Sequence, residues 1–414
     1  MSTILLLLDA FRHDYLKEIT TPFLWRCAQE GEYYYNVVQS MGFCERTEIL
    51  TGLEGDKTGF FTAIGFDPQN SPYVKVPLMR FLGIIEDITL FPLRLFSRNF
   101  HTQVQEKMRY LISCQFKEMG ITMPSYFIPY SWLPYFSLTE DRIDHRNPAA
   151  FQVPTILTLL AEAGRTYCYD TFTALNFNSP YQSDADRLNA VICDIQKSPK
   201  DLYLVYIAAP DVFGHWYGPD SLDFRRVLRS LDKDLEHFVQ SLEQKVPGNR
   251  YVFLGDHGMM TVNKRIDAAK EISRLLRLVR LRKGRDVIYF LDSTMVRLWA
   301  ISDKARSMLP VVLTKSDMFN RNGTWMDEKI AKRNNVPLSD RRYGDYLWVA
   351  NPGTLIFPDY FHIRRPCKGM HGYDPHLPES RGTCIHWGSG IPSSKKPVLP
   401  LSGVFNVIKR SLEL

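Results

Sequence analysis

The chain has 414 residues, of which 45% are hydrophobic and 23% charged, an ordinary composition for one large α/β domain or two modest ones. Its net charge of +6 is too mild to predict binding to a nucleic-acid polymer, although it suits an anionic substrate or a peripheral membrane contact. The seven cysteines form no CxxC pair, and no apolar stretch reaches the roughly 18 residues of a membrane span. We therefore expect a soluble, cytoplasmic protein with reduced thiols and without a signal peptide or transmembrane segment.

The first predicted element is a strand at residues 4–8, a continuous run of Ile and Leu that stops at Asp9. A run this short and unbroken is typical of a strand that is buried on both faces of a parallel or mixed sheet. Asp9 then lies at the carboxyl end of the strand, where open α/β sheets build their sites, but it could equally cap the next helix. These residues alone leave both interpretations of Asp9 open.

Helical and strand-like segments alternate through much of the chain, which predicts βαβ units and a doubly wound sheet. We predict a short helix around Ile49 and Leu50, because a glycine and a polar turn precede them and Gly52 follows them. The amino-terminal end of this helix could bind an anion. The other predicted helices span residues 21–31, 154–164, 184–197 and 223–244, and the other predicted strands span residues 32–39, 165–170, 201–209 and 250–254.

Residues 70–147 differ from this pattern. The segment 74–96 is apolar with charged interruptions, and the segment 126–136 is strongly aromatic. We predict an inserted, aromatic-rich cap over a core formed by residues 1–69 and 148–414. The cap could present an amphipathic surface to a lipid or an apolar substrate, but we favour a helical cap that buries its own apolar face.

Metal-binding residue types follow the predicted apolar strands. Asp9 follows the first strand, and Asp211 with His215 follows the second at a spacing that could place both on one side of a turn. Asp and neutral His are natural ligands for zinc or a similar divalent ion. Two such ions about 4 Å apart suit phosphoryl or sulfuryl transfer, because the pair can hold the attacking and leaving oxygens together.

Asp256 and His257 follow the third strand and are adjacent in the sequence. They can share one site only if the backbone turns sharply, which Gly255 and Gly258 would permit. A further His-Gly pair begins at His371. One such histidine would more often be a surface residue, but several clusters beside glycine favour a metal site.

Five motifs recur in one family: LLLLDAFRHDYL with TPFL after it, LTGLEGDKTGFFTAIGFDP, PDVFGHWYGP, GDHGM and MHGYDP. Together they resemble the type I phosphodiesterase/nucleotide pyrophosphatase family of the alkaline phosphatase superfamily. The resemblance implies an α/β/α sandwich with a mixed, mostly parallel central sheet, and two divalent metal ions, zinc first, with manganese or magnesium as alternatives. It also implies that one ion is held by Asp9, Asp256 and His257, and the other by Asp211, His215 and His371.

The sequence departs from the family at the nucleophile. The family places Thr or Ser ten residues before the Gly of its T-G turn, and here that position is Gly42; its phosphate-binding Asn falls on Ala63. Cys44 is our first substitute nucleophile, because a thiolate at a helix amino terminus beside metal ions would have a lowered pKa. A buried, inert Cys44 is the competing interpretation.

Thr47 and Ser40 are the other side-chain alternatives, and direct attack by a hydroxide that a metal ion activates would need no side-chain nucleophile. Arg46 resembles the basic residue that follows the nucleophile in the sulfatase branch and could bind an anionic oxygen in a bidentate manner.

We therefore predict a two-metal phosphodiesterase or phosphohydrolase whose substrate is a small phosphate ester with a nucleoside, sugar or lipid moiety. A sulfatase or a phosphoryl-group transferase on the same scaffold is the first alternative, although no proline follows Cys44 as it does in sulfatases. The second is a metal-binding pseudoenzyme without turnover, which the missing Thr and Asn suggest.

Overall fold

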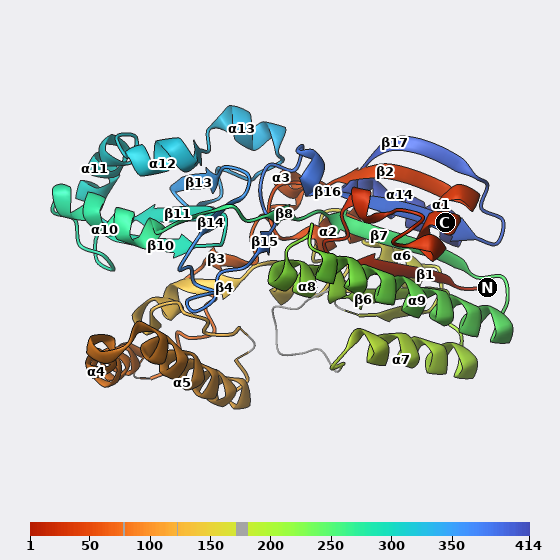
Figure 1. Cartoon of the computed structure of the whole chain (residues 1–414), viewed down its shortest axis with the longest axis horizontal. Coiled ribbons are helices and arrows are strands. Elements are labelled where there is room, and N and C mark those ends of the chain that lie inside the picture. Colours follow the sequence, from red (N-terminus) through yellow and green to blue (C-terminus); the bar gives the residue numbers. More distant parts are fainter. Residues whose placement is uncertain (78, 122, 171–180) are drawn as a thin grey trace.

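The computed structural model describes residues 1–77, 79–121, 123–170 and 181–414. Its centre is a seven-stranded sheet in which β1 lies between β7 and β6 (Figure 1). Every pairing is parallel except those of β16, which runs antiparallel to both of its neighbours. The strands, in spatial order, are β17 (Ser394–Pro400), β2 (Glu32–Val38), β16 (Arg381–Gly388), β7 (Arg250–His257), β1 (Thr3–Leu8), β6 (Leu202–Ile207) and β5 (Tyr167–Tyr169).

The β1 strand is buried on both faces, as its apolar run predicts. Ile4, Leu6 and Leu8 pack into the core on one face of the sheet, whereas Leu5 and Leu7 pack into the core on the other, because successive side chains of a strand point to opposite faces. β1 is therefore an interior strand of the sheet, with a paired strand on each side.

Helices cover both faces of this sheet, which confirms the predicted α/β/α sandwich. On one face lie α1 (Pro22–Glu30), α7 (Asp184–Lys197) and α9 (Leu222–Lys245). On the other face lie α2 (Glu45–Thr51), α6 (Ile156–Glu162) and α14 (Val404–Leu412). Two further short helices are α3 (Gly55–Thr58) and α8 (Ala209–Tyr217).

A second lobe extends from one end of the main sheet, and both termini lie at the opposite end of the molecule (Figure 1). Its antiparallel sheet has the order β10 (Val287–Leu291), β11 (Met295–Ala300), β13 (Tyr346–Ala350) and β12 (Gly323–Trp325). Its helices are α10 (Ala268–Leu278), α11 (Asp303–Leu313), α12 (Asp317–Asn322) and α13 (Glu328–Arg333). Sequence analysis did not separate this lobe from the predicted core.

Three short strand pairs connect these parts of the molecule. They are β3 (Ile64–Phe66) with β4 (Phe136–Leu138), β8 (Met260–Thr261) with β15 (Gly369–Met370), and β9 (Lys264–Ile266) with β14 (Thr354–Ile356).

The predicted insert contains the hairpin of α4 (Met79–Phe96) and α5 (Arg98–Glu118). Buried residues of the insert share one hydrophobic core with the second lobe, and the buried Arg109–Glu86 ion pair joins the two helices. One stripe of α4 remains exposed: Phe81, Ile84, Ile85, Ile88 and Phe91. The insert therefore buries part of its apolar surface against the second lobe and leaves this stripe exposed.

No helix in the described ranges combines the length and the apolar character that crossing a bilayer requires.

Candidate metal centre and catalytic pocket

A cavity of about 390 Å³ opens at the carboxyl ends of β1 and β7. Both lobes contribute to its lining, with Asp9 and His257 from the main sheet and Ser293 from the turn between β10 and β11. Carboxyl ends of parallel strands are where open α/β sheets place their ligands. All six predicted metal ligands line this cavity.

The first ligand group joins Asp9, Asp256 and His257. One ligand atom from each lies within 4.8 Å of the others, and the Nε2 atom of His257 lies 3.2 Å from the Oδ1 atom of Asp9. The parallel pairing of β1 with β7 brings Asp9 beside the other two residues, since Leu7 is in register with Leu254. The structure therefore favours the interpretation of Asp9 as a site residue over that of a helix cap.

The sharp turn predicted at Asp256 and His257 is wrong. Both residues belong to the extended strand β7, and neither Gly255 nor Gly258 has a positive φ. These glycines instead permit close approach of other backbone segments, because a Cβ at Gly255 would lie 2.1 Å from the carbonyl oxygen of Phe11. Because glycine has no side chain, the loop after β1 can pass close to β7 at this point.

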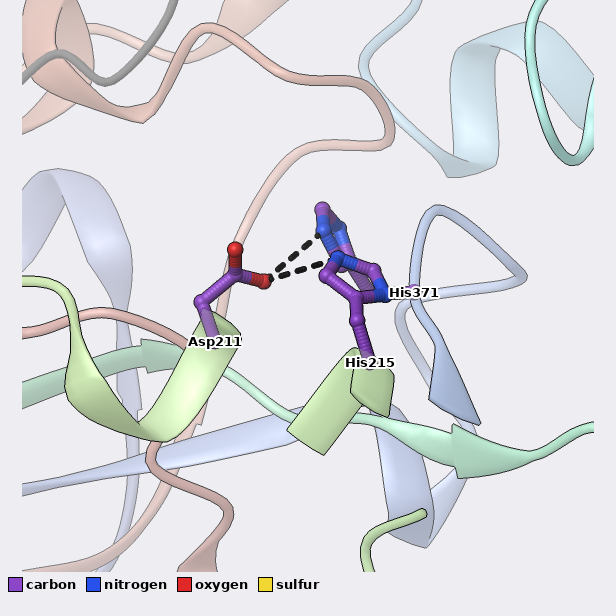
Figure 2. A group of neighbouring side chains, drawn as sticks. All are labelled: Asp211, His215 and His371. Carbon is purple, nitrogen blue, oxygen red and sulfur yellow. Dashed lines mark ion pairs between the residues drawn. The ribbon is translucent and has the colours of Figure 1, made fainter. Parts of the chain in front are cut away.

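The second ligand group joins Asp211, His215 and His371, whose side chains converge in Figure 2. Asp211 and His215 lie one turn apart on α8, as their spacing of four predicts, and His371 follows β15. The Oδ1 atom of Asp211 lies 3.1 Å from the Nε2 atom of His215 and 3.3 Å from the Nε2 atom of His371.

Two glycines let α8 approach the β8–β15 pair. A Cβ at Gly214 would lie 2.6 Å from the sulfur of Met259, and a Cβ at Gly369 would lie 2.6 Å from the carbonyl oxygen of Gly214. His371 therefore reaches α8, which lies about 155 residues earlier in the chain.

The two ligand groups are neighbours. The rings of His257 and His371 are stacked with their centroids 4.4 Å apart, and those of His215 and His371 are 5.2 Å apart. One phosphoryl group bound in the cavity could therefore contact both groups, as two-metal chemistry requires.

The donor set fits divalent cations. The buried Oδ1 atom of Asp211 accepts no hydrogen bond although two imidazole nitrogens lie close to it, so these atoms converge without bonding to one another. The Nδ1 atoms of His215 and His257 lie 2.8 Å and 3.0 Å from the carbonyl oxygens of Gly369 and Gly258, which leaves each Nε2 atom facing its group. Imidazoles oriented in this way are typical of metal ligands.

Outer contacts hold the carboxylates of the first group. The hydroxyl of Tyr206 donates a hydrogen bond to Asp9, and the backbone N–H groups of Ala10 and His257 donate to the Oδ1 atom of Asp256 at 3.2 Å and 2.9 Å. Burial raises the pKa of Asp256 to about 7, although the charge of His257 opposes this shift.

The segment 42–47 forms the other side of the cavity, where the family has its nucleophile. Gly42 has a φ of +131°, and a Cβ there would lie 1.9 Å from the carbonyl oxygen of Phe61. The N–H of Phe43 donates to the same oxygen at 2.8 Å. A side chain at position 42 is therefore excluded by both conformation and space.

Cys44 and Thr47 lie behind the cavity wall. Cys44 is 8% exposed and its sulfur lies 3.8 Å from the Oγ1 atom of Thr139; burial raises the pKa of its thiol well above the ordinary value. Thr47 is fully buried, and its Oγ1 atom lies 3.0 Å from the Nε2 atom of His145. Neither residue lines the cavity.

Arg46 and Ala63 line the cavity, whereas the Ser40 hydroxyl accepts a hydrogen bond from the N–H of Gly55. Arg46 is buried and forms an ion pair with Asp141, so its charge is partly engaged within the protein.

Sequence analysis missed Glu45, the first residue of α2, whose side chain lines the cavity within electrostatic reach of His257 and Asp256. An acidic residue at the predicted start of this helix, three positions after Gly42, was the available signal. It also missed Tyr126, Phe361 and His362, which reach the cavity from the insert and from the segment after β14.

Comparison with known proteins gives a family match. The family model of type I phosphodiesterase/nucleotide pyrophosphatase matches residues 3–374. Human ectonucleotide pyrophosphatase/phosphodiesterase family member 7 is 31% identical over 80 residues, which are 19% of this chain and 18% of that protein. Alkaline phosphatase PafA of Elizabethkingia meningoseptica is 42% identical over 60 residues, which are 14% of this chain and 11% of that protein. The matched segments thus span less than a fifth of either relative.

The fold is also found in solved structures. Human ectonucleotide pyrophosphatase/phosphodiesterase 5 has a TM-score of 0.68 at 18% identity, covering 100% of this chain and 95% of that chain. The murine form, an inactive variant in complex with AMP, gives the same values. At this identity the likeness supports the fold.

Proposed function

We propose that this chain, which belongs to the type I phosphodiesterase/nucleotide pyrophosphatase family, is a two-metal hydrolase of phosphodiesters. The observation that carries the proposal is the pair of adjacent ligand groups, Asp9/Asp256/His257 and Asp211/His215/His371, which line one cavity. Zinc is the ion we propose first, because carboxylate and imidazole donors suit it, with manganese or magnesium as alternatives.

The bound ions would supply positive charge for the oxygens of a phosphoryl group. The residues of the chain would supply a further cationic group and would orient the metal ligands. Arg46 lines the cavity and supplies a further cationic group, although Asp141 shares its charge. The Tyr206 hydroxyl holds Asp9, and the backbone N–H groups of Ala10 and His257 hold Asp256, so the ligands keep their orientation between turnovers.

We also propose that the substrate is a small phosphate ester with a nucleoside, sugar or lipid moiety. Tyr126 and Phe361 line the cavity as an edge-to-face pair with centroids 4.9 Å apart, a wall that suits a flat or apolar leaving group. A long polymer of nucleic acid is not expected, because the net charge of +6 is mild.

A screen of the purified protein tests the activity. The protein is stripped with a chelator, reloaded with zinc or manganese, and assayed with bis-p-nitrophenyl phosphate, p-nitrophenyl phosphate and a nitroaryl sulfate, with metal content measured on the same samples. We expect the diester to be turned over fastest and the chelated protein to be inactive. Faster turnover of the sulfate would favour the sulfatase alternative, and two bound ions without turnover of any ester would favour the pseudoenzyme.

Peripheral contact with a membrane is a further proposal. The exposed stripe of α4 carries Ile88 at 69% and Phe91 at 61% exposure, apolar side chains that could insert among lipid acyl chains. Sedimentation with vesicles tests it: wild-type protein should co-sediment more than a variant with Ile88→Glu and Phe91→Glu. Equal sedimentation of both proteins would contradict it.

We also propose a cytoplasmic location for the protein. All seven cysteines are free thiols, a state that a reducing compartment maintains. Titration of thiols in protein prepared under native conditions should return seven per unfolded chain, and a lower value would contradict this proposal.

A further inference from the structure

The cavity contains four carboxylates outside the two ligand groups: Glu45, Glu140, Asp141 and Asp292. Three of them are engaged in the structure. Asp141 pairs with Arg46, Asp292 pairs with Arg297 at 2.8 Å, and Glu140 accepts the N–H of Thr47. Glu45 differs from them because the charges that act on it most strongly are those of the ligands His257 and Asp256, with which it lines the cavity.

Glu45 stands next to the first ligand group but is not a member of it. The three atoms of Asp9, Asp256 and His257 lie within 4.8 Å of one another, and the Glu45 carboxylate does not join that group. Glu45 is the first residue of α2, so the start of this helix places it at the cavity. Glu45 and the ligand group line the same cavity, whose volume of about 390 Å³ is large enough to hold a water molecule.

Segment 42–47 places no hydroxyl in the cavity that could replace the nucleophile of the family. Gly42 has no side chain and no space for one, while Cys44 and Thr47 lie behind the cavity wall. Glu45 is the first residue of segment 42–47 that lines the cavity and can accept a proton. Phe43 also lines the cavity, but its side chain is apolar.

We propose that Glu45 is a general base, and that water attacks phosphorus directly, without a covalent enzyme intermediate. The water oxygen forms the new bond to phosphorus, and its proton passes to the Glu45 carboxylate. The bond between phosphorus and the ester oxygen breaks, and the leaving group departs with that electron pair. This role rests on the phosphodiesterase activity proposed above and deepens it.

A substitution series tests the role of Glu45. Glu45→Gln keeps the size of the side chain and removes the base, and we expect kcat with bis-p-nitrophenyl phosphate to fall by roughly 10²–10⁴-fold with little change in KM. The nitrophenolate leaves without a proton, so the loss reports on activation of the water. Glu45→Asp should recover part of the loss. Metal content and thermal unfolding of each variant are measured alongside.

Glu48→Gln is the matched control. Glu48 is a buried carboxylate on the same helix, it accepts the N–H of Ser40 at 3.4 Å, and it does not line the cavity. Its substitution should leave kcat within about threefold of the wild type, because it touches no reacting atom. Full activity in Glu45→Gln, or loss of metal from it, would overturn the proposed role.

The stereochemical course gives an independent readout. The wild type is given a phosphorothioate diester of one configuration at phosphorus in water labelled with ¹⁸O. Attack by water in a single displacement inverts the configuration, whereas a covalent intermediate requires two displacements and retains it. Inversion is the expected result; retention, or a phosphoryl adduct found on the intact protein by mass spectrometry, would overturn the role of Glu45 and leave the hydrolase intact. Absence of any turnover with both ions bound would instead overturn the proposed function.

Discussion

Two sides of one cavity differ in how they relate to the family. The ligand side, formed by Asp9, Asp211, His215, Asp256, His257 and His371, has the expected residue type at every position. The α2 side, formed by residues 42–47, keeps the backbone of a turn into a helix but has glycine where the family has a hydroxyl. Both sides line the same cavity, and our proposals assign metal binding to the ligand side and the attack on phosphorus to the α2 side.

The physical basis of this difference lies in how each side is built. On the ligand side, Asp9 and His257 occupy the ends of paired strands, and Asp211 and His215 share one helical turn, so regular hydrogen bonding fixes their positions. On the α2 side, contacts between loops, such as that of Gly42 and Phe43 with the carbonyl oxygen of Phe61, position the backbone. A substitution on the ligand side should therefore remove metal, while one on the α2 side should change stability or turnover with the metal retained.

The largest effect is expected for His257→Ala on the ligand side. We expect loss of one or both ions and a fall in kcat/KM of at least roughly 10³-fold, because several kcal/mol of transition-state charge stabilisation disappear with the metal. Elemental analysis and steady-state kinetics measure both quantities. His386→Gln is the control: His386 is buried on β16 beside Glu32, in register with Val252, and outside the cavity. Full metal content in His257→Ala would contradict the assignment.

Gly42→Ala should act on stability. The new Cβ would meet the carbonyl oxygen of Phe61 at 1.9 Å in a left-handed backbone, so we expect the free energy of unfolding to fall by about 2–4 kcal/mol, measured by urea denaturation. Gly164→Ala is the matched control, because Gly164 has a φ of +65° with nothing within 4 Å, and should cost only about 1 kcal/mol. Equal losses in the two variants would show that the contact with Phe61 is unimportant.

Metal uptake should depend on pH. Burial lowers the pKa of His257, but the Asp256 carboxylate outweighs this effect and raises the pKa well above its ordinary value; the Asp211 carboxylate likewise raises the pKa of His215. Below these pKa values the metal-free protein carries protons that a metal ion must displace. The affinity for the ion should therefore rise with pH, by about tenfold per pH unit for each proton displaced. Calorimetry between about pH 6 and pH 8 in two buffers measures the affinity and the protons released. A metal affinity that does not change with pH would contradict this prediction.

The fold and the ligand side were largely predictable from the sequence. The apolar run at residues 4–8 and the charged face of the helix at 223–244 follow simple periodicity, and the structure has both elements as β1 and α9. Asp9 was ambiguous by itself, because helix caps and metal ligands use the same residue type. Its role depends on the pairing of β1 with β7, about 250 residues apart, which local patterns do not encode.

The second lobe and the α2 side were harder to predict. Strand β10 is a continuous apolar run, but the core of its lobe includes side chains from the insert, so no local segment shows that these strands form a separate lobe. At residues 42–47 the sequence shows which residue types are present but not which side chains face the cavity. Cys44 at a helix start suggested a reactive thiol, whereas the structure buries it and leaves Glu45 in the opening.

The smallest effect is expected for Cys44→Ala on the α2 side. The thiol lies behind the cavity wall, and burial raises its pKa well above the ordinary value, so thiolate would be scarce near neutral pH. We expect kcat to stay within about threefold of the wild type, with the free energy of unfolding lowered by about 1 kcal/mol through the small void.

Thr47→Val gives a second check on the same side. It removes the hydroxyl that lies 3.0 Å from His145 and should lower the free energy of unfolding by about 1–3 kcal/mol while turnover continues, because a buried imidazole nitrogen loses its partner. Steady-state kinetics and denaturation separate the two effects in each variant. If Cys44→Ala abolished turnover with both ions retained, the α2 side would contain a side-chain nucleophile after all, and the difference from the family would reduce to a change of residue from hydroxyl to thiol.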